Sequence, residues 1–492
     1  MNTVAGSAVA AGSKPRRLHP IGLVAHKEWT ELRRDARWRV LLVVTLLLMA
    51  AALALGLERS RHLADVHEQA EAGDRQVWTA QGAKNPHAAA HFGQYAHKPV
   101  GPLAVADPGV DTFVGNAVWL EAHRQNDVQF RAARDGTLAA RMGQLNLAFV
   151  LQTVLPLMAL LLGFAAVAGE REQGTLRQWV ALGLRPWHLL AGKALTCAAV
   201  LAALLIVACG GLTLGLALAG DEVMLPAGQG WRLVGLALAY GLYLLGFLLL
   251  ALAVSAAVRS ARLALVGLLM FWLLNSFLVP RAATDLVRAQ SPLPSAQSMR
   301  TAMAEDKKQL FGHDEKHPGF IAFRERVLRE HGVARIEDLP VNFRALALRE
   351  DDQAGYRIFD RYFGRLHAQI EAQDTRREWA GFVFPMLALQ PLSMAMAGTD
   401  NRHHHDFVRA AEAHRRLIQA AISQDLLAHA RPGQTDYVAT PALWARIPAF
   451  AYQAPAASWA WQSQGGNVAA LLLWCVLCAT AARLAAGRLQ RL

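Results

Sequence analysis

Residues 231–258 read WRLVGLALAYGLYLLGFLLLALAVSAAV, and Arg232 is the single charged residue in this run. A hydrocarbon core about 30 Å thick is crossed by a helix of about 20 apolar residues. The run is therefore long enough to cross a bilayer, and a helix satisfies its backbone polar groups internally. Five more apolar runs occur, at 39–57, 145–168, 189–219, 263–280 and 468–486. The sequence thus predicts an all-α membrane protein with six transmembrane helices.

The composition of the whole chain supports this prediction. The chain has 492 residues, of which 54% are hydrophobic, and its net charge is +12. A basic chain can bind nucleic acid, but here Lys and Arg flank the apolar runs, where they anchor helices at the membrane surface. We therefore expect membrane lipid, and not nucleic acid, as a partner. All four cysteines lie in apolar runs, which excludes a disulfide framework.

The distribution of basic residues predicts the orientation in the membrane, because cytoplasmic loops carry an excess of Lys and Arg. Basic residues gather before the first run, between the second and third, between the fourth and fifth, and after the sixth. The loop 220–230 carries Asp221 and Glu222 and no Lys or Arg. Six alternating spans place all the basic groups on one side, so both termini of this multi-pass protein are expected in the cytoplasm.

The predicted domain boundaries follow from these spans. The cytoplasmic parts are an N-terminus at 1–38, a segment at 169–188 and a tail at 487–492. Two long segments, 58–144 and 281–467, then lie on the extracytoplasmic side. Because their length is unusual for a simple channel, we expect them to form a largely helical extracytoplasmic domain.

Apolar periodicity within the two long segments predicts where their helices lie. A helix is expected at about 60–81 and another at 406–429, and a third presents Phe359, Tyr362, Phe363, Leu366 and Ile370 on one face. The Gly/Pro-rich stretch 84–115, which contains His87, His91 and His97, is expected to be an irregular loop followed by a helix from 116. No run alternates clearly enough to predict a strand.

The cytoplasmic stretch 169–176 reads GEREQGTL and leads into a short amphipathic helix. Leu176, Trp179, Val180 and Leu184 recur at helical spacing, Thr175 is the expected N-cap, and Pro186 follows the end of the helix. Two interpretations of this helix remain open on spacing alone. It docks in the groove of a partner protein, or it is an interfacial connector that lies on the membrane.

A resemblance favours the first interpretation. Glu170, Glu172, Gly174 and Thr175, followed by Pro186 and by Gly192-Lys193, resemble the coupling segment of ABC-2 type permeases. A basic amphipathic helix before the first span is similar to the connecting helix of that family, and its apolar face is formed by Ile21, Val24, Trp29, Leu32 and Ala36. The six expected spans also fit the family.

This resemblance implies the function, the partners and the location of the chain. It implies the permease subunit of a transporter in a bacterial inner membrane, with an unidentified substrate. A separate ATP-binding subunit would hold ATP and Mg²⁺, and a second permease, identical or related, would complete a dimer. The implied contact with the ATP-binding subunit is formed by Glu170, Glu172, Gly174, Thr175, Leu176 and Trp179.

The long extracytoplasmic segments resemble a subfamily, the DUF3526-type permeases, which is related to permeases linked to multicopper-enzyme maturation. Four stretches carry this resemblance: Asn85-Pro86-His87, Asp107-Pro108-Gly109, residues 120–126 (LEAHRQN) and Ala397-Gly398-Thr399-Asp400. The resemblance extends over nearly the whole chain, and it does not imply a particular substrate.

The chain itself is not expected to bind a cofactor or to catalyse a reaction. No GxxxxGK[ST] motif accompanies Gly192-Lys193, because Trp187 stands where the first glycine would be and Ala194 follows the lysine. ATP hydrolysis is therefore expected in the partner subunit. Ser, His and Asp occur in no nucleophile-elbow context, so no catalytic residue is predicted.

Metal binding is a secondary hypothesis. His403, His404 and His405 are candidate ligands, since imidazole binds copper and zinc. Adjacent helical residues point in different directions, however, and this region has no histidine pair at i, i+4 spacing, so a polar cluster at a helix start is the simpler interpretation. Met386, Met394 and Met396 suit Cu(I) but also fill cores. The alternative to a transporter is thus a membrane-anchored extracytoplasmic binding or assembly protein, with metal as one candidate ligand, that needs no ATPase.

Overall fold

The computed structural model describes residues 19–131, 145–219, 230–311 and 315–489. The loop 220–229 and the outer ends of the 1–38 and 487–492 segments lie outside these residues. Within them, six helices are long and apolar enough to cross a membrane, which confirms the prediction of an all-α bundle. The spans are Ala36–Thr79, Leu147–Glu172, Pro186–Leu218, Gly230–Ala257, Ala261–Gln290 and Gly465–Leu489.

Four spans are single helices, and the second and fifth spans are each built from several elements. α11 (Pro186–Leu218), α12 (Gly230–Ala257) and α22 (Gly465–Leu489) are continuous. α2 (Ala36–Thr79) is 44 residues long, about 66 Å at 1.5 Å per residue, so it crosses a bilayer and continues beyond it. The second span comprises α7 (Leu147–Phe149), η2 (Val150–Val154), α8 (Leu155–Gly163) and α9 (Ala168–Glu172). The fifth comprises α13 (Ala261–Leu273), η4 (Leu274–Leu278) and α14 (Val279–Gln290).

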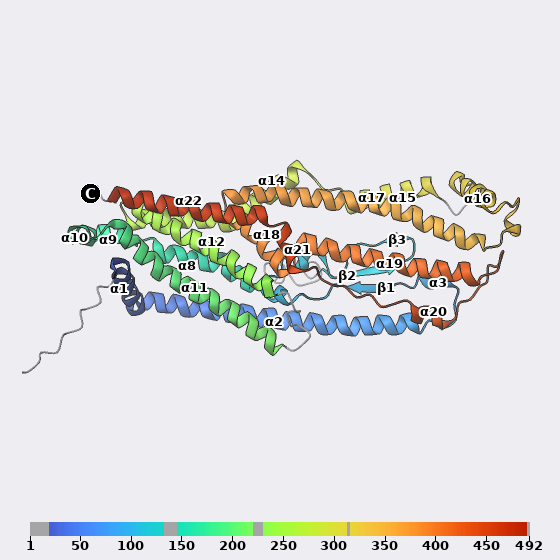
Figure 1. Ribbon diagram of the computed structural model, residues 1–492, viewed down its shortest axis with the longest axis horizontal. Coiled ribbons are helices and arrows are strands. Elements are labelled where there is room, and N and C mark those ends of the chain that lie inside the picture. The colour runs from blue at the N-terminus through green and yellow to red at the C-terminus, as the bar shows by residue number, and fades with distance from the viewer. Residues whose placement is uncertain (1–18, 132–144, 220–229, 312–314, 490–492) are drawn as a thin grey trace, which may run out of the picture.

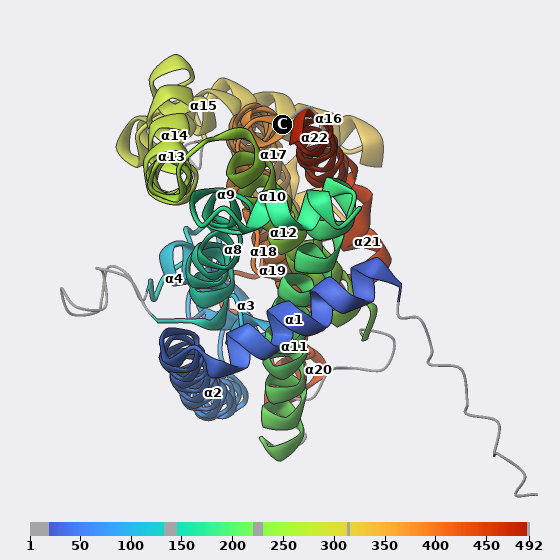
Figure 2. The same ribbon diagram turned by 90° about the vertical axis from the view of Figure 1, so that its left-hand side faces the viewer.

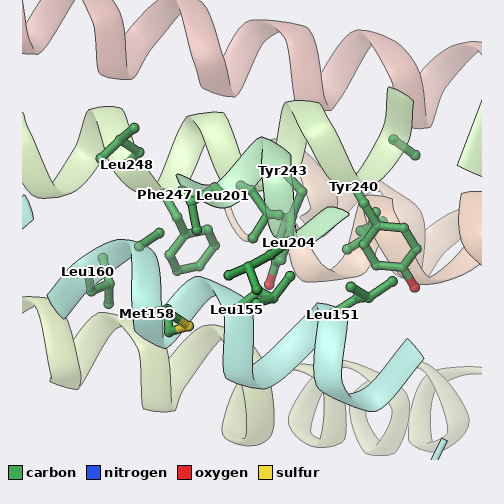
Figure 3. Packing of buried hydrophobic residues seen from close by; sticks show 14 of the residues in the cluster. Leu151, Leu155, Met158, Leu160, Leu201, Leu204, Tyr240, Tyr243, Phe247 and Leu248 are labelled. Carbon is green, nitrogen blue, oxygen red and sulfur yellow. The ribbon is translucent and has the colours of Figure 1, made fainter. Parts of the chain in front are cut away.

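The core of the bundle is built around α12, which contacts α8, α11 and α22. Tyr240, Tyr243 and Phe247 of α12 point toward leucines of α8 and α11 and are almost fully buried (Figure 3). Gly163 at the end of α8 lets the chain approach α12 closely, because a Cβ atom there would lie 2.6 Å from the Cβ of Ala251. Small residues at such crossings are typical of membrane helix packing, which depends on close van der Waals contact.

The second and fifth spans each contain one turn of π-helix, η2 and η4. A proline follows each turn by two residues, Pro156 in the second span and Pro280 in the fifth. Proline has no N–H to donate to the carbonyl four residues earlier. The carbonyl of Gln152, four residues before Pro156, instead accepts a hydrogen bond from Tyr243 Oη at 3.2 Å. The π-turn of the second span therefore offers other helices backbone carbonyls that a regular helix would have paired internally, and the carbonyl of Thr153 likewise accepts from Trp272 Nε1 at 3.0 Å.

The described residues 58–131, 281–311 and 315–464 form an insertion domain at one end of the bundle (Figure 1). α2 extends along it, and α17 (Phe343–Trp379) and α19 (Asn401–His429) run beside each other. The other elements are α3 (Pro86–Ala90), η1 (Pro102–Val105), α4 (Asp111–Val114), α15 (Ala296–Leu310), α16 (Pro318–His331), η5 (Ile336–Asp338), η6 (Ala380–Phe382), α18 (Met386–Ala397), α20 (Pro441–Arg446) and α21 (Ala457–Gln462). α18 belongs to the main core of the bundle, since Met386, Leu389 and Met396 are buried with residues of α12.

The prediction of an irregular loop at 84–115, and of a helix from 116, was wrong. This region contains short helices and a three-stranded antiparallel sheet of β1 (Gln94–His97), β2 (Ala117–Glu121) and β3 (Arg124–Gln125). Gln94 pairs with Leu120 and His97 with Ala117. Strands of two to five residues are too short for a period of two to stand out in the sequence.

The two parts of the insertion domain are joined where two of the quoted sequence motifs meet. The backbone N–H of Val110 donates to the carbonyl of Thr399 at 2.9 Å, and Thr399 Oγ1 donates to the carbonyl of Asp107 at 3.0 Å. A Cβ atom at Gly109 would lie 2.4 Å from that Thr399 carbonyl oxygen, and the φ angle of Gly109 is +47°. Only glycine fits this contact without strain, which explains why the Asp-Pro-Gly motif ends in glycine.

We predict that Gly163→Ala lowers the free energy of unfolding by about 1–3 kcal/mol, because the added methyl group overpacks the contact with Ala251. The matched control is Gly210→Ala in α11, where a Cβ atom meets nothing within 4 Å. That substitution should be neutral or stabilising by up to about 1 kcal/mol, since alanine favours the helix. Denaturant unfolding of both variants in detergent measures the difference, and equal effects would contradict the packing assigned to Gly163.

Candidate functional site

The expected coupling segment lies at the end of the bundle opposite the insertion domain. It consists of α9 and α10 (Thr175–Ala181), joined by Gln173 and Gly174. Gly174 has a φ of 76°, a left-handed conformation that glycine adopts without strain and that reverses the chain between the two helices. Figure 2 views the molecule from this end, with α10 and the N-terminal helix α1 (Pro20–Arg34) toward the viewer.

Glu170 is the centre of a charged network that holds this segment together. The residue is 9% exposed, and its Oε1 atom lies 3.0 Å from Lys27 Nζ and 3.2 Å from Lys193 Nζ. Its Oε2 atom accepts hydrogen bonds from the Thr175 hydroxyl and from Trp179 Nε1, the latter at 3.3 Å. A buried carboxylate needs such partners to offset its desolvation. One side chain therefore connects α9 to α1, α10 and α11.

The neighbours of Glu170 attach the segment to two more spans. Arg171 donates to the carbonyls of Ala256, at 3.0 Å, and Val258 at the end of α12. A Glu172 carboxylate oxygen accepts from the backbone N–H of Ala261 at 3.0 Å and so caps the first turn of α13. Inside the bundle, the hydroxyl of Ser255 accepts the N–H groups of Val167 and Ala168. Force applied to α9 and α10 would thus reach α1 and the third, fourth and fifth spans.

The Gly192-Lys193 pair has a structural role at the crossing of α1 and α11. A Cβ atom at Gly192 would lie 2.6 Å from Val24, so glycine permits the two helices to touch. Lys193 is buried and pairs with Glu28 of α1 as well as with Glu170. The expected apolar face of α1 is found only in part, because Val24 is 2% exposed while Trp29 is 46% exposed. Ala36 lies beyond α1, since the helix ends at Arg34 and α2 begins at Ala36.

Residues of the coupling segment fall into a buried group and an exposed group. Leu176 is buried, Glu170 is nearly so, and Thr175 and Trp179 are half-buried against them. The prediction that Thr175 caps α10 was wrong: Gly174 occupies the cap position, and the Thr175 hydroxyl bonds to Glu170. The exposed surface carries Leu182, 81% exposed, together with Glu172, Gly174, Arg177, Gln178 and Val180.

A second candidate site is a cavity of about 1210 Å³ between the bundle and the insertion domain. Both π-turns contribute to its wall, through Gln152 and Thr153 of η2 and Ser276 and Phe277 of η4. The opposite wall comes from α17, α18 and α19 and carries charged residues of both signs, among them Asp374, Arg377, Glu378, Asp400 and Arg402. π-turns inside α-helices occur frequently at functional sites, which makes this cavity a candidate for the substrate path.

Polar residues of the spans connect this cavity to the centre of the bundle. Gln152 Nε2 donates to Tyr240 Oη at 2.9 Å, and that hydroxyl lies 2.9 Å from Ser393 Oγ, which donates to Asp107 at 2.5 Å. Asn275 donates to Tyr243 Oη at 3.1 Å and accepts from the Met386 N–H. These bonds join the second, fourth and fifth spans to α18, and such polar groups hold membrane helices together.

The histidine run at 403–405 is not brought together as a ligand set. His403 is buried, and its Nδ1 and Nε2 atoms lie 2.6 Å from Asp400 and 3.2 Å from Arg232. His405 stacks on His367 of α17, with 3.6 Å between ring centroids. Burial lowers the pKa of His404 to about 3, so this residue is neutral at pH 7. The three side chains thus serve different neighbours, as their adjacent positions on a helix require.

A histidine group that the sequence analysis missed lies elsewhere, among the described residues of the first long segment. Nitrogen atoms of His87, His91 and His123 all lie within 4.8 Å of one another. The signal was present in the sequence, because His87 and His91 have the i, i+4 spacing that the run at 403–405 lacks. It was overlooked because residues 84–115 were expected to be irregular. In the structure α3 forms here, and residues four apart on a helix are neighbours on its surface.

Comparisons with known proteins agree with the resemblance drawn from the sequence. A family model described as ABC-2 family transporter protein matches residues 23–309, which is more than half of the chain. A second model, a domain of unknown function (DUF3526), matches residues 296–453 in the insertion domain. No curated protein matches the chain.

We predict that Glu170→Gln lowers the free energy of unfolding by about 3 kcal/mol, because it leaves buried Lys193 without one of its carboxylates. Hydrogen exchange should rise in α1 and α10, the two elements that Glu170 joins. The matched control is Glu172→Gln, which removes an exposed capping carboxylate and should cost about 1 kcal/mol or less, with α1 unchanged. Equal protection of α1 in the wild type and in Glu170→Gln would contradict the role assigned to Glu170.

Proposed function

The chain belongs to the ABC-2 family of transporter proteins, and on this premise we propose that it is the permease subunit of a bacterial inner-membrane transporter driven by a separate ATP-binding subunit. Membership assigns a role in transport across a membrane. The ATP-binding partner, the site of contact and the substrate path go beyond membership and are our proposals.

One observation carries the proposal: α9 and α10 present an exposed surface and are at the same time bonded to α1 and to three of the spans, the third, fourth and fifth. An ordinary interfacial connector needs only an apolar side toward the lipid. Here Glu170, Arg171 and Glu172 each bond to a different helix. A partner that pushes on α10 would therefore move helices, which is the mechanical requirement for coupling ATP hydrolysis to transport.

The two groups of residues in the coupling segment have different proposed roles. Glu170, Thr175, Leu176 and Trp179 position α10, since they are wholly or partly buried against one another and against α1. Glu172 and Gly174 are exposed and adjoin the contact surface, whose centre we assign to Arg177, Val180 and Leu182. An exposed leucine beside an arginine suits a groove in a partner protein, because such anchors provide most of the energy of an interface.

The proposed orientation places the coupling segment in the cytoplasm and the insertion domain outside it. α1, α10 and the C-terminal end of α22 lie at one end of the molecule (Figure 1). That end carries Arg33, Arg34 and Arg37 near the first span and Arg259 and Arg262 between the fourth and fifth. The excess of basic residues supports a cytoplasmic location, and both termini would lie there.

We further propose that the cavity is part of the substrate path and that two permeases form the complete transporter. The cavity opens where the bundle meets the insertion domain, and its mixed charges suit a polar substrate. The first and fifth spans leave most of their surface uncovered by the rest of the chain. They offer apolar faces to lipid or to a second permease, and a pathway shared between two bundles would bring the two cavities together.

We predict that Leu182→Asp abolishes co-purification of the ATP-binding subunit and its stimulation of ATP hydrolysis, while the unfolding free energy of the permease stays within about 0.5 kcal/mol of wild type. Leu182 is 81% exposed, so an aspartate there meets water and not the core. The measurement is pull-down of the partner together with ATPase activity in nanodiscs.

The matched control is Leu417→Asp on the exposed side of α19 in the insertion domain, which should leave the complex intact. Retention of a fully stimulated complex by Leu182→Asp would exclude this surface as the docking contact. Loss of the complex in both variants would show a general defect and would equally contradict the assignment.

A further inference from the structure

Three histidines from two separate sequence motifs converge in the insertion domain, away from the cavity and the coupling segment. His87 and His91 belong to α3 and its end, and His123 lies in the turn between β2 and β3. The Nε2 atoms of His87 and His91 are 3.4 Å apart, and the centroid of the His123 ring lies 5.2 Å and 5.3 Å from those of the other two rings.

The local fold holds these rings in place. The side chain of Asn85 caps α3 by accepting the N–H groups of His87 and Ala88, and the following Pro86 suits the first helical turn. His87 and His91 then lie on one side of the helix, because residues four apart are neighbours on its surface. The hairpin is bound to α3 by the N–H of Ala122, which donates to the carbonyl of Ala90 at 3.2 Å.

The backbone of His123 points to a constraint that goes beyond turn formation. Its φ angle is +61°, in the left-handed region that residues other than glycine seldom adopt. Residues held in such conformations occur often at ligand-binding sites, where the surrounding structure fixes them. Here the conformation directs the ring of His123 toward those of His87 and His91.

Two carboxylates of α17 also lie beside the His123 ring. The Nδ1 atom of His123 lies 3.2 Å from Asp351 and 3.4 Å from Asp352. Asp351 is 1% exposed, and Lys307 also lies 3.4 Å from it. Metal-binding histidines characteristically donate one ring N–H to a carboxylate, which fixes the ring and leaves the other nitrogen for the metal. The pair Asp351 and Asp352 stands in that relation to His123.

We propose that His87, His91 and His123 form a binding site for a divalent transition metal of the zinc type, with Asp351 and Asp352 as the outer carboxylates. Zn²⁺ binds histidine nitrogen at 2.0–2.1 Å in tetrahedral geometry, which separates two ligand nitrogens by about 3.3 Å. The 3.4 Å between His87 and His91 matches this separation. Water would fill the fourth position, since His91 is exposed to solvent.

Such a site would tie the two parts of the insertion domain to each other. The three ligands come from the first long segment, whereas the carboxylates come from α17 in the second. Metal binding to a folded site stabilises the fold that presents it. This metal site is separate from the coupling segment, so its test is independent of the test of the proposed transport function.

The test uses the full-length chain in detergent, with no polyhistidine tag, after metals are removed with a chelator and the chelator is dialysed away. Titration calorimetry with Zn²⁺ should show one tight site per chain, and an excess of Mg²⁺ should not compete, because Mg²⁺ prefers oxygen ligands. Co²⁺ in place of Zn²⁺ should give the intense visible absorption of a tetrahedral site. Zn²⁺ should also raise the Tm.

The variants distinguish the proposed metal ligands from a histidine outside the site and from a carboxylate that only positions a ligand. His91→Ala, at the most exposed ligand, should weaken Zn²⁺ binding at least 100-fold and abolish the Co²⁺ spectrum and the rise in Tm. His331→Ala removes an exposed histidine at the end of α16 and should change none of these readings. Asp352→Asn should weaken binding 10–100-fold while the tetrahedral Co²⁺ spectrum remains, as expected of a positioning residue.

The metal-free Tm of each variant shows whether it folds, and His91→Ala should match the wild type because its side chain is exposed. If His91→Ala nevertheless unfolds, the same titration of His87→Gln replaces it. Wild-type protein that binds no Zn²⁺ at one per chain, or Zn²⁺ binding that survives loss of His91 or His87 unchanged, would overturn the proposal. In that case the contact between His87 and His91 would be an ordinary hydrogen bond between two imidazoles.

Discussion

The ion pairs of Glu170 with Lys27 and Lys193 are the interaction on which the end of the protein opposite the insertion domain depends. Charges this far removed from water are stable only while every partner stays in place. The contacts of this network therefore cannot be lost one at a time without cost. Either α1, α9, α10 and α11 move together, or the network breaks. This property suits a coupling element, which must pass on displacement without absorbing it. Glu170, the most buried acidic residue of the segment, accordingly lies beneath the exposed residues of α10.

A second set of polar contacts continues from the bundle to the insertion domain. Gln152, Tyr240, Ser393 and Asp107 form a chain of hydrogen bonds from the second and fourth spans through α18 to the first long segment. α18 is the part of the insertion domain that enters the core of the bundle, so it links the two bodies. An unpaired polar group costs more free energy inside a membrane core than at a surface. The hydrogen-bonded side chains therefore favour a small number of discrete arrangements in which each of them keeps a partner.

Hydropathy predicted the bundle because every span must itself be long and apolar. Each span can therefore be recognised from its own residues alone. The coupling segment was located by its resemblance to a family, but the sequence did not show which of its residues are buried. Glu170 is enclosed by Lys27, which is 143 residues away in the chain, and no local pattern reports such a contact. The sheet escaped prediction because its strands are too short to show a period. The spacing of His87 and His91 was visible, yet the third histidine follows 32 residues later and meets them only through the fold of the hairpin.

The long helices explain how distant parts of one chain act on each other. α1 is bonded to the Glu170 network, and only Asp35, which caps α2, separates it from the first span. α2 then runs without a break to Trp78, whose Nε1 donates to the carbonyl of Trp444 in the insertion domain at 3.2 Å. A continuous helix resists compression along its axis because its backbone hydrogen bonds run parallel to that axis. The first span therefore forms an unbroken helix, about 66 Å long, between α1 and the insertion domain. The first span is thus a second physical connection between the Glu170 network and the insertion domain, beside the hydrogen bonds that reach α18.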